Sequence, residues 1–197
     1  MRTESQLRHE KLYHIAASQA GYFTAAQALD VGFSRRSLSY YVKTGRFERV
    51  GSGLYRLALF PASENEDLFR AWLEVGRKGV ISHDSALALY DLSDALPSEI
   101  HLTVPPTTSR RRQGMRLHTN HLTAGQTTRY MGLPVTTIPR TIADVIAGGL
   151  ADELVIQAIR QALGRGMVTP QAIWSLGEER GGRASRLIRA AMQGVGE

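Results

Sequence analysis

The sequence predicts an α+β protein in two parts: a small N-terminal helical module with a β-hairpin, and a mixed α/β part that ends in several helices. Three observations lead to this fold class. Short helices that begin at capping residues and end at glycine fill the first 62 residues. Segments rich in β-branched and apolar residues follow between residues 99 and 138. Helical periodicity resumes from residue 140 onward.

The first predicted helix spans residues 5–20. Leu12, Ile15 and Ala16 recur at the spacing of one helix face, so this face is expected to enter a core. Gly21 ends the helix, because glycine adopts the backbone conformation that commonly follows a last helical turn.

Two shorter helices follow in close succession. Thr24 is a suitable N-cap for residues 25–30, and Ser34 is one for residues 35–44, because both hydroxyls can accept a hydrogen bond from the first turn. Helices of this length joined by tight turns are typical of a helix-turn-helix.

Residues 47–58 predict a β-hairpin, because two alternating segments meet at the sequence Gly51-Ser52-Gly53. With the preceding helices, this hairpin predicts a winged helix-turn-helix over residues 1–62. The segment 59–63 breaks the pattern and marks the expected domain boundary. Residues 63–197 therefore form the second predicted domain.

The second predicted domain alternates between helical and extended segments before its helical end. Trp72 and Val75 lie on one side of its first amphipathic helix, and Thr169-Pro170 is a cap followed by a first-turn residue. Helices are expected over residues 64–78, 82–90, 141–147, 152–163, 170–176 and 183–192, and strands over residues 99–104, 115–119 and 134–138.

Positive charge is concentrated in the first predicted domain. The chain has a formal net charge of +6, from 24 Lys and Arg against 18 Asp and Glu. Residues 1–62 hold nine of these basic residues and four of the acidic ones, a net charge of +5, which leaves +1 for the rest of the chain. A concentrated basic segment favours a polyanionic partner.

The third predicted helix has two chemically different sides. On a helical wheel Leu38 and Tyr41 fall on the side that packs against the preceding helices. The other side carries basic, hydroxyl and phenol groups, which can reach phosphates and base edges in a major groove. A solvated helix face and a protein-docking module are the alternative interpretations. The predicted DNA-binding residues, the hairpin included, are Arg35, Arg36, Ser39, Tyr40, Lys43, Arg49 and Arg56.

Composition excludes several classes of protein. There is no cysteine, so disulfides, thiolate zinc sites and cysteine nucleophiles are excluded. No apolar run reaches the ~18 residues of a membrane span. We therefore expect a soluble cytoplasmic protein without a membrane partner, and no motif indicates a cofactor.

Two groups of residues in the second domain contain the residue types of catalytic or metal sites. Ser82-His83-Asp84 are consecutive, and neighbours at a helix start point in different directions, so Ser82 is interpreted as an N-cap instead. His118 and His121 straddle an expected strand end without a nearby acid or cysteine. We expect surface or loop histidines and no metal site.

Two arginine clusters in the second domain have open interpretations. The first lies in a Pro- and Thr-rich loop and fits a solvated loop, a second nucleic-acid contact or a docking patch for an acidic partner. It consists of Arg110, Arg111, Arg112 and Arg116. The second, Arg183, Arg186 and Arg189, is expected to be the solvent face of the last helix.

A metal-dependent nuclease is a less favoured alternative. Nuclease sites need two or three acids, often with a lysine, that converge on a metal ion. The acids Asp84, Asp91, Asp94 and Glu99 form no acid-x-lysine motif, and Lys78 is the sole lysine beyond residue 62. We do not expect an enzyme.

Three segments resemble a known family. Residues 21–61, which begin GYFTAAQALDVGFSRRSLSYYVKTG, resemble the N-terminal winged helix of the AbiEi family, the antitoxins and transcriptional regulators of type IV toxin–antitoxin systems. Residues 81–105 and GLPVTTIPRTIADVI, residues 132–146, resemble parts of that family's C-terminal domain in the expected order. Residues 148–197 carry no recognisable motif.

The resemblance implies two activities. The winged helix would bind inverted repeats in double-stranded DNA of its own promoter and repress the operon, through the seven DNA-binding residues named above. The C-terminal domain would counteract a nucleotidyltransferase-like toxin encoded nearby, without residues that can be assigned. A stand-alone winged-helix regulator with a dimerisation or sensing domain is the alternative. No heptad or long apolar seam indicates an oligomeric state.

Overall fold

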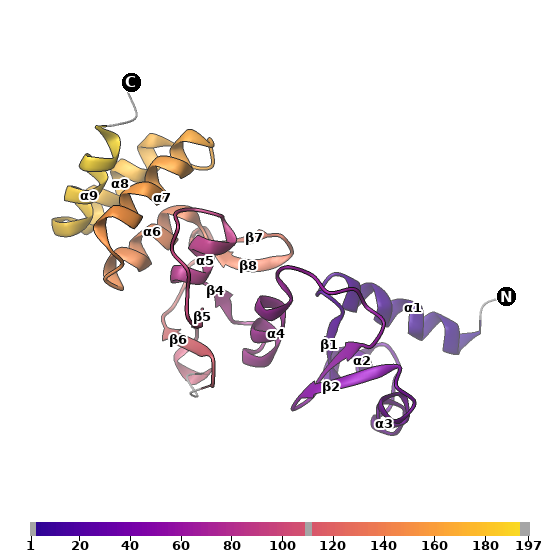
Figure 1. The fold of residues 1–197 in the computed structure, drawn as a ribbon. Coiled ribbons are helices and arrows are strands. Elements are labelled where there is room, and N and C mark those ends of the chain that lie inside the picture. Colours follow the sequence, from indigo (N-terminus) through magenta and orange to yellow (C-terminus); the bar gives the residue numbers. More distant parts are fainter. Residues whose placement is uncertain (1–2, 109–111, 194–197) are drawn as a thin grey trace. The chain divides into compact units, whose positions relative to one another are not determined.

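The computed structural model describes residues 3–108 and 112–193. The chain divides into two compact units, Met1–Arg77 and Lys78–Glu197, which are described separately as unit 1 and unit 2. Both contain helices and a β-sheet (Figure 1). The expected α+β fold class, with an N-terminal helix-turn-helix, is confirmed.

Unit 1 has the predicted helices and hairpin. Thr24 and Ser34 are the N-caps of α2 and α3. In each helix the cap hydroxyl accepts a hydrogen bond from the backbone amide of the third helical residue. The side chain of that third residue accepts one from the backbone amide of the cap in return. The elements are α1 (Glu4–Ala17), β1 (Tyr22–Thr24), α2 (Ala25–Asp30), α3 (Arg35–Lys43), β2 (Phe47–Gly51), β3 (Leu54–Leu57) and α4 (Glu66–Val75).

An aromatic-rich core holds unit 1 together. The rings of Phe23 and Phe47 meet edge to face with their centroids 5.0 Å apart, and Phe33 and Tyr41 pack beside them. Leu12 and Ala16 of α1 are buried in the same cluster, as the sequence predicts. This core supports α3 from its inner side.

The sheet of unit 1 contains a strand that the sequence did not reveal. β1 pairs antiparallel with β3, so the strand order is β1-β3-β2. At three residues, β1 is too short for a period-two pattern to show. α4 contacts β1, and the compact unit therefore extends beyond residue 62 to Arg77. A functional division after residue 62 stays a prediction.

Unit 2 contains a mixed five-stranded sheet in the order β6-β5-β4-β8-β7. β4 pairs antiparallel with β5 and parallel with β8, whereas β5 and β6 run parallel. Its strands are β4 (Val80–Ile81), β5 (Ile100–Val104), β6 (Met115–Thr119), β7 (Thr127–Tyr130) and β8 (Leu133–Thr136). Short 3₁₀ turns cover Pro106–Thr108 and Ala124–Gln126, the latter labelled η2.

Five described helices complete unit 2. They are α5 (His83–Leu89), α6 (Ile138–Ala147), α7 (Asp152–Gly164), α8 (Pro170–Arg180) and α9 (Gly182–Met192). α6 begins three residues before the expected start, with Pro139 in its first turn, where a missing amide costs no hydrogen bond. α9 contacts both α7 and α8, as the orange and yellow helices of Figure 1 show.

Arg183 corrects one expectation about α9. Its guanidinium donates to the carbonyl oxygens of Ile146 (2.6 Å) and Leu150 and to Asp152. The side chain thus connects α9 to the end of α6 and the start of α7. The sequence interpretation of Arg183 as a solvent-facing residue is wrong, because periodicity cannot reveal a carbonyl acceptor on a neighbouring element.

Candidate nucleic-acid interface and a buried polar network

The α3 helix separates its apolar and polar residues as expected. Leu38 is 2% exposed and Tyr41 is 9% exposed, whereas Tyr40 is 60% exposed. Arg35, Arg36, Ser39 and Lys43 are exposed as well. The Ser39 hydroxyl donates to the Arg35 carbonyl within the helix (3.1 Å). The helix therefore presents three cations and a phenol on one accessible surface.

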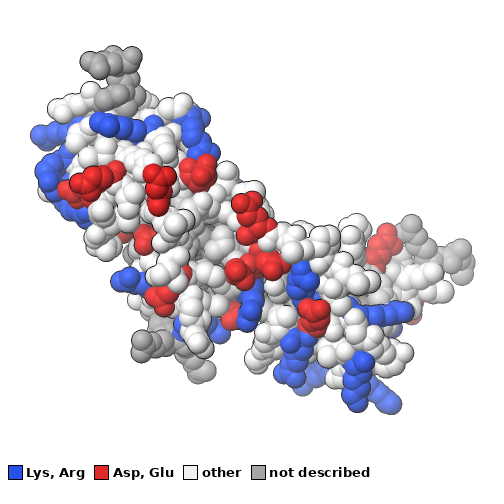
Figure 2. Space-filling model, in the orientation of Figure 1, with Lys and Arg blue, Asp and Glu red and all other residues white. Residues whose placement is uncertain are grey.

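The cations of α3 have no counter-ion in the part of the chain that the structure describes. Arg35, Arg36 and Lys43 form no ion pair with a residue that the structure describes. Figure 2 shows Lys and Arg side chains gathered where α3 and the hairpin of unit 1 lie. Unpaired exposed guanidinium and ammonium groups are the groups that bind phosphate oxygens.

The hairpin supplies one exposed arginine and one that is engaged elsewhere. Arg49 is exposed on β2, and its Nε donates to the carbonyl of Gly51 (3.4 Å). The Arg56 side chain is 13% exposed and lies 3.4 Å from the Glu66 carboxylate. Its Nη2 also donates to the Phe60 carbonyl (2.9 Å), so Arg56 stabilises the link to α4, and its DNA contact stays a prediction.

The other predicted arginine patch falls only partly within the structure. Arg110 and Arg111 lie outside the described residues. Arg116 is exposed on β6, the edge strand, and Arg112 forms an isolated bridge with Met115 just before it. These two residues belong to unit 2, whereas α3 belongs to unit 1.

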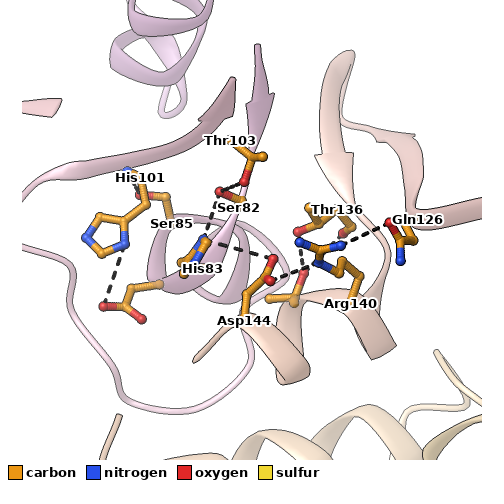
Figure 3. A network of polar contacts seen from close by, with 11 residues as sticks. Ser82, His83, Ser85, His101, Thr103, Gln126, Thr136, Arg140 and Asp144 are labelled. Atoms are coloured by element: carbon orange, nitrogen blue, oxygen red, sulfur yellow. Dashed lines mark hydrogen bonds and ion pairs between the residues drawn. The ribbon is translucent and has the colours of Figure 1, made fainter. Parts of the chain in front are cut away.

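A buried polar network in unit 2 was missed by the sequence interpretation (Figure 3). Ser82 is 0% exposed and occupies the N-cap position of α5, as the sequence predicts, but its hydroxyl makes no cap hydrogen bond and bonds within the network instead. Thr103 donates to its hydroxyl (2.9 Å), and Nδ1 of His83 lies 3.0 Å from the same oxygen. The Ser85 hydroxyl accepts from the amide of His101 (2.8 Å).

Three histidines meet beside this serine. The rings of His83 and His118 are stacked with centroids 3.5 Å apart, and His101 lies 5.2 Å from His118. His118 is therefore a half-buried residue of β6 within this histidine cluster, and its interpretation as a surface or loop residue is wrong. His121 is exposed. The cluster joins α5, β5 and β6, a meeting of distant segments that no local pattern signals.

The environment keeps the three imidazoles neutral. Burial, followed by the neighbouring His118 and His101, lowers the pKa of His83 to about 3. Burial, with smaller effects of His101 and Arg116, lowers the pKa of His118 to about 4. Burial also lowers the pKa of His101, although Asp84 acts in the opposite direction. Desolvation disfavours the charged form of each ring.

An ion pair on α6 continues the network. Arg140 Nε donates to Asp144 Oδ1 (2.8 Å), and Asp144 Oδ2 lies 4.0 Å from His83 Nδ1. Burial raises the pKa of Asp144, while the adjacent Arg140 guanidinium opposes that rise. The i, i+4 spacing of Arg140 and Asp144 was visible in the sequence and could have indicated their pairing.

The network does not form a Ser-His-Asp relay. Ser82 and Asp144 both face the same nitrogen of His83, whereas a relay requires one partner on each ring nitrogen. Within residues 3–108 and 112–193, no group of three His, Cys, Asp or Glu residues could hold a metal ion. The geometry supports a structural or ligand-binding role over nucleophilic catalysis.

The comparisons with known proteins assign the helix-turn-helix. Residues 10–58 match the family model described as transcriptional regulator, AbiEi antitoxin. We call this matched segment, residues 10–58, the AbiEi module. The AbiEi module covers α2, α3 and the hairpin, which carry the exposed cations. Its description is that of a regulator and not of an enzyme.

The fold has a counterpart among solved structures. The chain is similar to the RV2827C protein from Mycobacterium tuberculosis, with a TM-score of 0.57 and 12% sequence identity, over 96% of this chain and 78% of that chain. At this identity the likeness shows the fold alone. No curated protein matches this chain significantly. No helix in the described part of the chain is long and apolar enough to cross a membrane.

Proposed function

We propose that this chain is the DNA-binding antitoxin of a type IV toxin–antitoxin system. The exposed cations of α3, which lie inside the AbiEi module and pair with no acid among the described residues, carry the proposal. Unit 1 represses the chain's own operon, and the part after residue 62 counteracts a nucleotidyltransferase-like toxin.

Operator recognition follows from the position of the charges on α3. A recognition helix enters the major groove with its N-terminal residues leading, and Arg35 and Arg36 occupy that end. Lys43 in the last turn reaches the flanking phosphates, while Arg49 on the hairpin provides a second backbone contact. Arg56 is left out because its guanidinium is already bonded within unit 1.

A gel-shift titration on the DNA upstream of the chain's own gene tests this assignment. The double variant Arg36→Ala/Lys43→Ala should bind about 100-fold more weakly, because two charged contacts of about 1.4 kcal/mol each are lost. The charge-matched control Arg70→Ala/Arg77→Ala removes two exposed arginines of the same unit and should bind like the wild type. Equal weakening in both double variants would contradict the α3 assignment.

Toxin neutralisation is tested separately in cells. Arg36→Ala/Lys43→Ala should still protect against the toxin encoded next to the gene, because α3 belongs to unit 1. Loss of protection at normal protein level would show that the two activities share α3.

A stand-alone transcriptional regulator is the second candidate function. It is favoured by one observation: the AbiEi model matches residues 10–58 and does not extend into unit 2. The neighbouring reading frame separates the candidates. A nucleotidyltransferase-like gene supports the antitoxin, and its absence supports the stand-alone regulator.

A further inference from the structure

Unit 2 contains a small pocket beside the buried network. Its volume is about 210 Å³, and it lies between η2, the first turn of α6 and the last turns of α8. The polar residues in its wall are Gln126, Thr137, Arg140, Ser175, Glu179 and Arg180. All of them belong to unit 2 and none is part of the α3 surface.

Arg140 gives the pocket a buried guanidinium with free donors. The side chain is 8% exposed, and it lines the pocket. Nε donates to Asp144, and Nη1 donates to Gln126 Oε1 (2.9 Å). Nη2 makes no hydrogen bond to any residue that the structure describes. A guanidinium has five N–H donors in a planar fork that suits an oxyanion, so several remain for a ligand.

The first turn of α6 adds backbone donors to the same wall. Thr137 occupies the N-cap position but makes no side-chain cap hydrogen bond. Pro139 has no amide hydrogen, and the amides of Ile138 and Arg140 donate to no acceptor in the described ranges. Uncapped amides at the positive end of a ten-residue helix attract an anion.

Two cations and two carboxylates lie in or beside the pocket, and Arg140 is the buried cation that lines it. Arg180, from the end of α8, is 46% exposed and lies near enough to lower the pKa of Asp144. Asp144 lies behind Arg140, and burial raises its pKa. Glu179 is the opposing charge, but it is 71% exposed and pairs with Arg180 at 3.8 Å. Its side chain can turn toward solvent when an anion enters.

We propose that this pocket binds an oxyanion of the phosphate class, either free phosphate or a phosphate group of a nucleotide. Arg140 and the first-turn amides of α6 bind the oxygens, Gln126 holds the Arg140 guanidinium, and Arg180 closes the outer side. The proposal does not rest on DNA binding by α3.

Calorimetric titration of the full-length protein tests the proposal. Inorganic phosphate and a nucleoside triphosphate are the two probes, against chloride at the same ionic strength. Saturable binding of either probe is expected. Tighter binding of phosphate identifies the free ion as the ligand, and tighter binding of the triphosphate identifies a nucleotide. Absence of saturable binding for both probes overturns the proposal.

Surface variants make the test specific to this pocket. Arg180→Gln should weaken binding about fivefold, and Glu179→Gln should tighten it about threefold, as expected for partly exposed charges. Arg129→Gln is the matched control, since Arg129 is exposed in the same unit, does not line the pocket and donates to the Gly132 carbonyl. Unchanged binding in both Arg180→Gln and Glu179→Gln, or equal weakening in Arg129→Gln, contradicts the site.

Arg140→Gln should have the largest effect on phosphate binding, namely the loss of saturable binding. Arg140 is buried and bonded to Asp144, so its replacement could disturb folding. The circular dichroism spectrum of the Arg140→Gln protein must therefore first match that of the wild type. If the variant does not fold, the two surface variants decide the question alone, because their side chains are solvent-accessible.

Discussion

At the scale of single residues, arginines that look equivalent in the sequence have different roles in the structure. Arg36 is exposed without an ion-pair partner in the described part of the chain, whereas Arg56 and Arg183 donate to backbone carbonyls and carboxylates of neighbouring elements. Charge and helical spacing could place Arg36 on a surface. They could not identify the acceptors of Arg183, which lie more than 30 residues away, or those of Arg56, which are oriented by the turn that follows β3.

The histidine cluster makes a residue-scale prediction about pH. Unfolded imidazoles titrate near the ordinary pKa of 6.5, whereas those of His83 and His118 titrate at about 3 and about 4 in the fold. Below pH 6.5 the unfolded chain binds protons that the folded chain does not. The contribution of these histidines to the free energy of unfolding should therefore be at its maximum above pH 6.5. It should decrease as the pH falls toward 4. His118→Gln should reduce the difference in thermal midpoint between about pH 7 and about pH 5.

His121→Gln is the control for this pH dependence, because His121 is exposed. It should keep the wild-type difference between the two midpoints. The same pH dependence in wild type and His118→Gln would mean that the cluster does not control acid stability.

At the scale of elements, capped helices were predictable and short strands were not. The capped helices α2 and α3 begin where Thr24 and Ser34 predict, and β6 coincides with residues 115–119. β1 and β4 are two or three residues long, and β7 is mostly polar, so none of them shows a strand pattern. The buried network was missed for a related reason: its residues come from α5, β5, β6 and α6, which β4 and β8 bring together.

The turn between α1 and β1 makes a prediction at this scale. Gly21 has a φ of +85°, and a Cβ atom placed on it would lie 2.6 Å from Cγ of Phe60. Gly21→Ala should therefore destabilise the protein by about 2–4 kcal/mol, because backbone strain and a steric clash add together. Chemical denaturation measures the change.

Gly32→Ala isolates the backbone part of that effect. Gly32 has a φ of +95° and no atom within 4 Å of the added Cβ. The Gly32→Ala substitution should lower the free energy of unfolding by about 1 kcal/mol, from backbone strain alone. Equal destabilisation by the two variants would show that Phe60 adds nothing at Gly21.

At the scale of the whole molecule, the uneven charge determines how binding responds to salt. Residues 1–62 carry +5 of the net +6, and α3 presents unpaired cations from this segment. If Arg36 and Lys43 each neutralise a phosphate, their replacement by alanine should flatten the slope of log K against log salt by about 2. Filter binding at several salt concentrations measures this slope.

The Arg70→Ala/Arg77→Ala protein should keep the wild-type slope, although it loses the same formal charge. A slope that flattens equally in both proteins would show that net charge, and not contact at α3, produces the salt dependence.

The pairing of β4 with β8 has a consequence for the order of folding. Ile81 lies opposite Val135, so the centre of the unit 2 sheet cannot form until the chain has reached β8. All elements of unit 1, by contrast, lie within residues 1–77 of the chain. Such distant pairings form slowly, and chains fold from the N-terminus during synthesis. On the ribosome, the helix-turn-helix therefore completes its fold while the rest of the chain is still being translated.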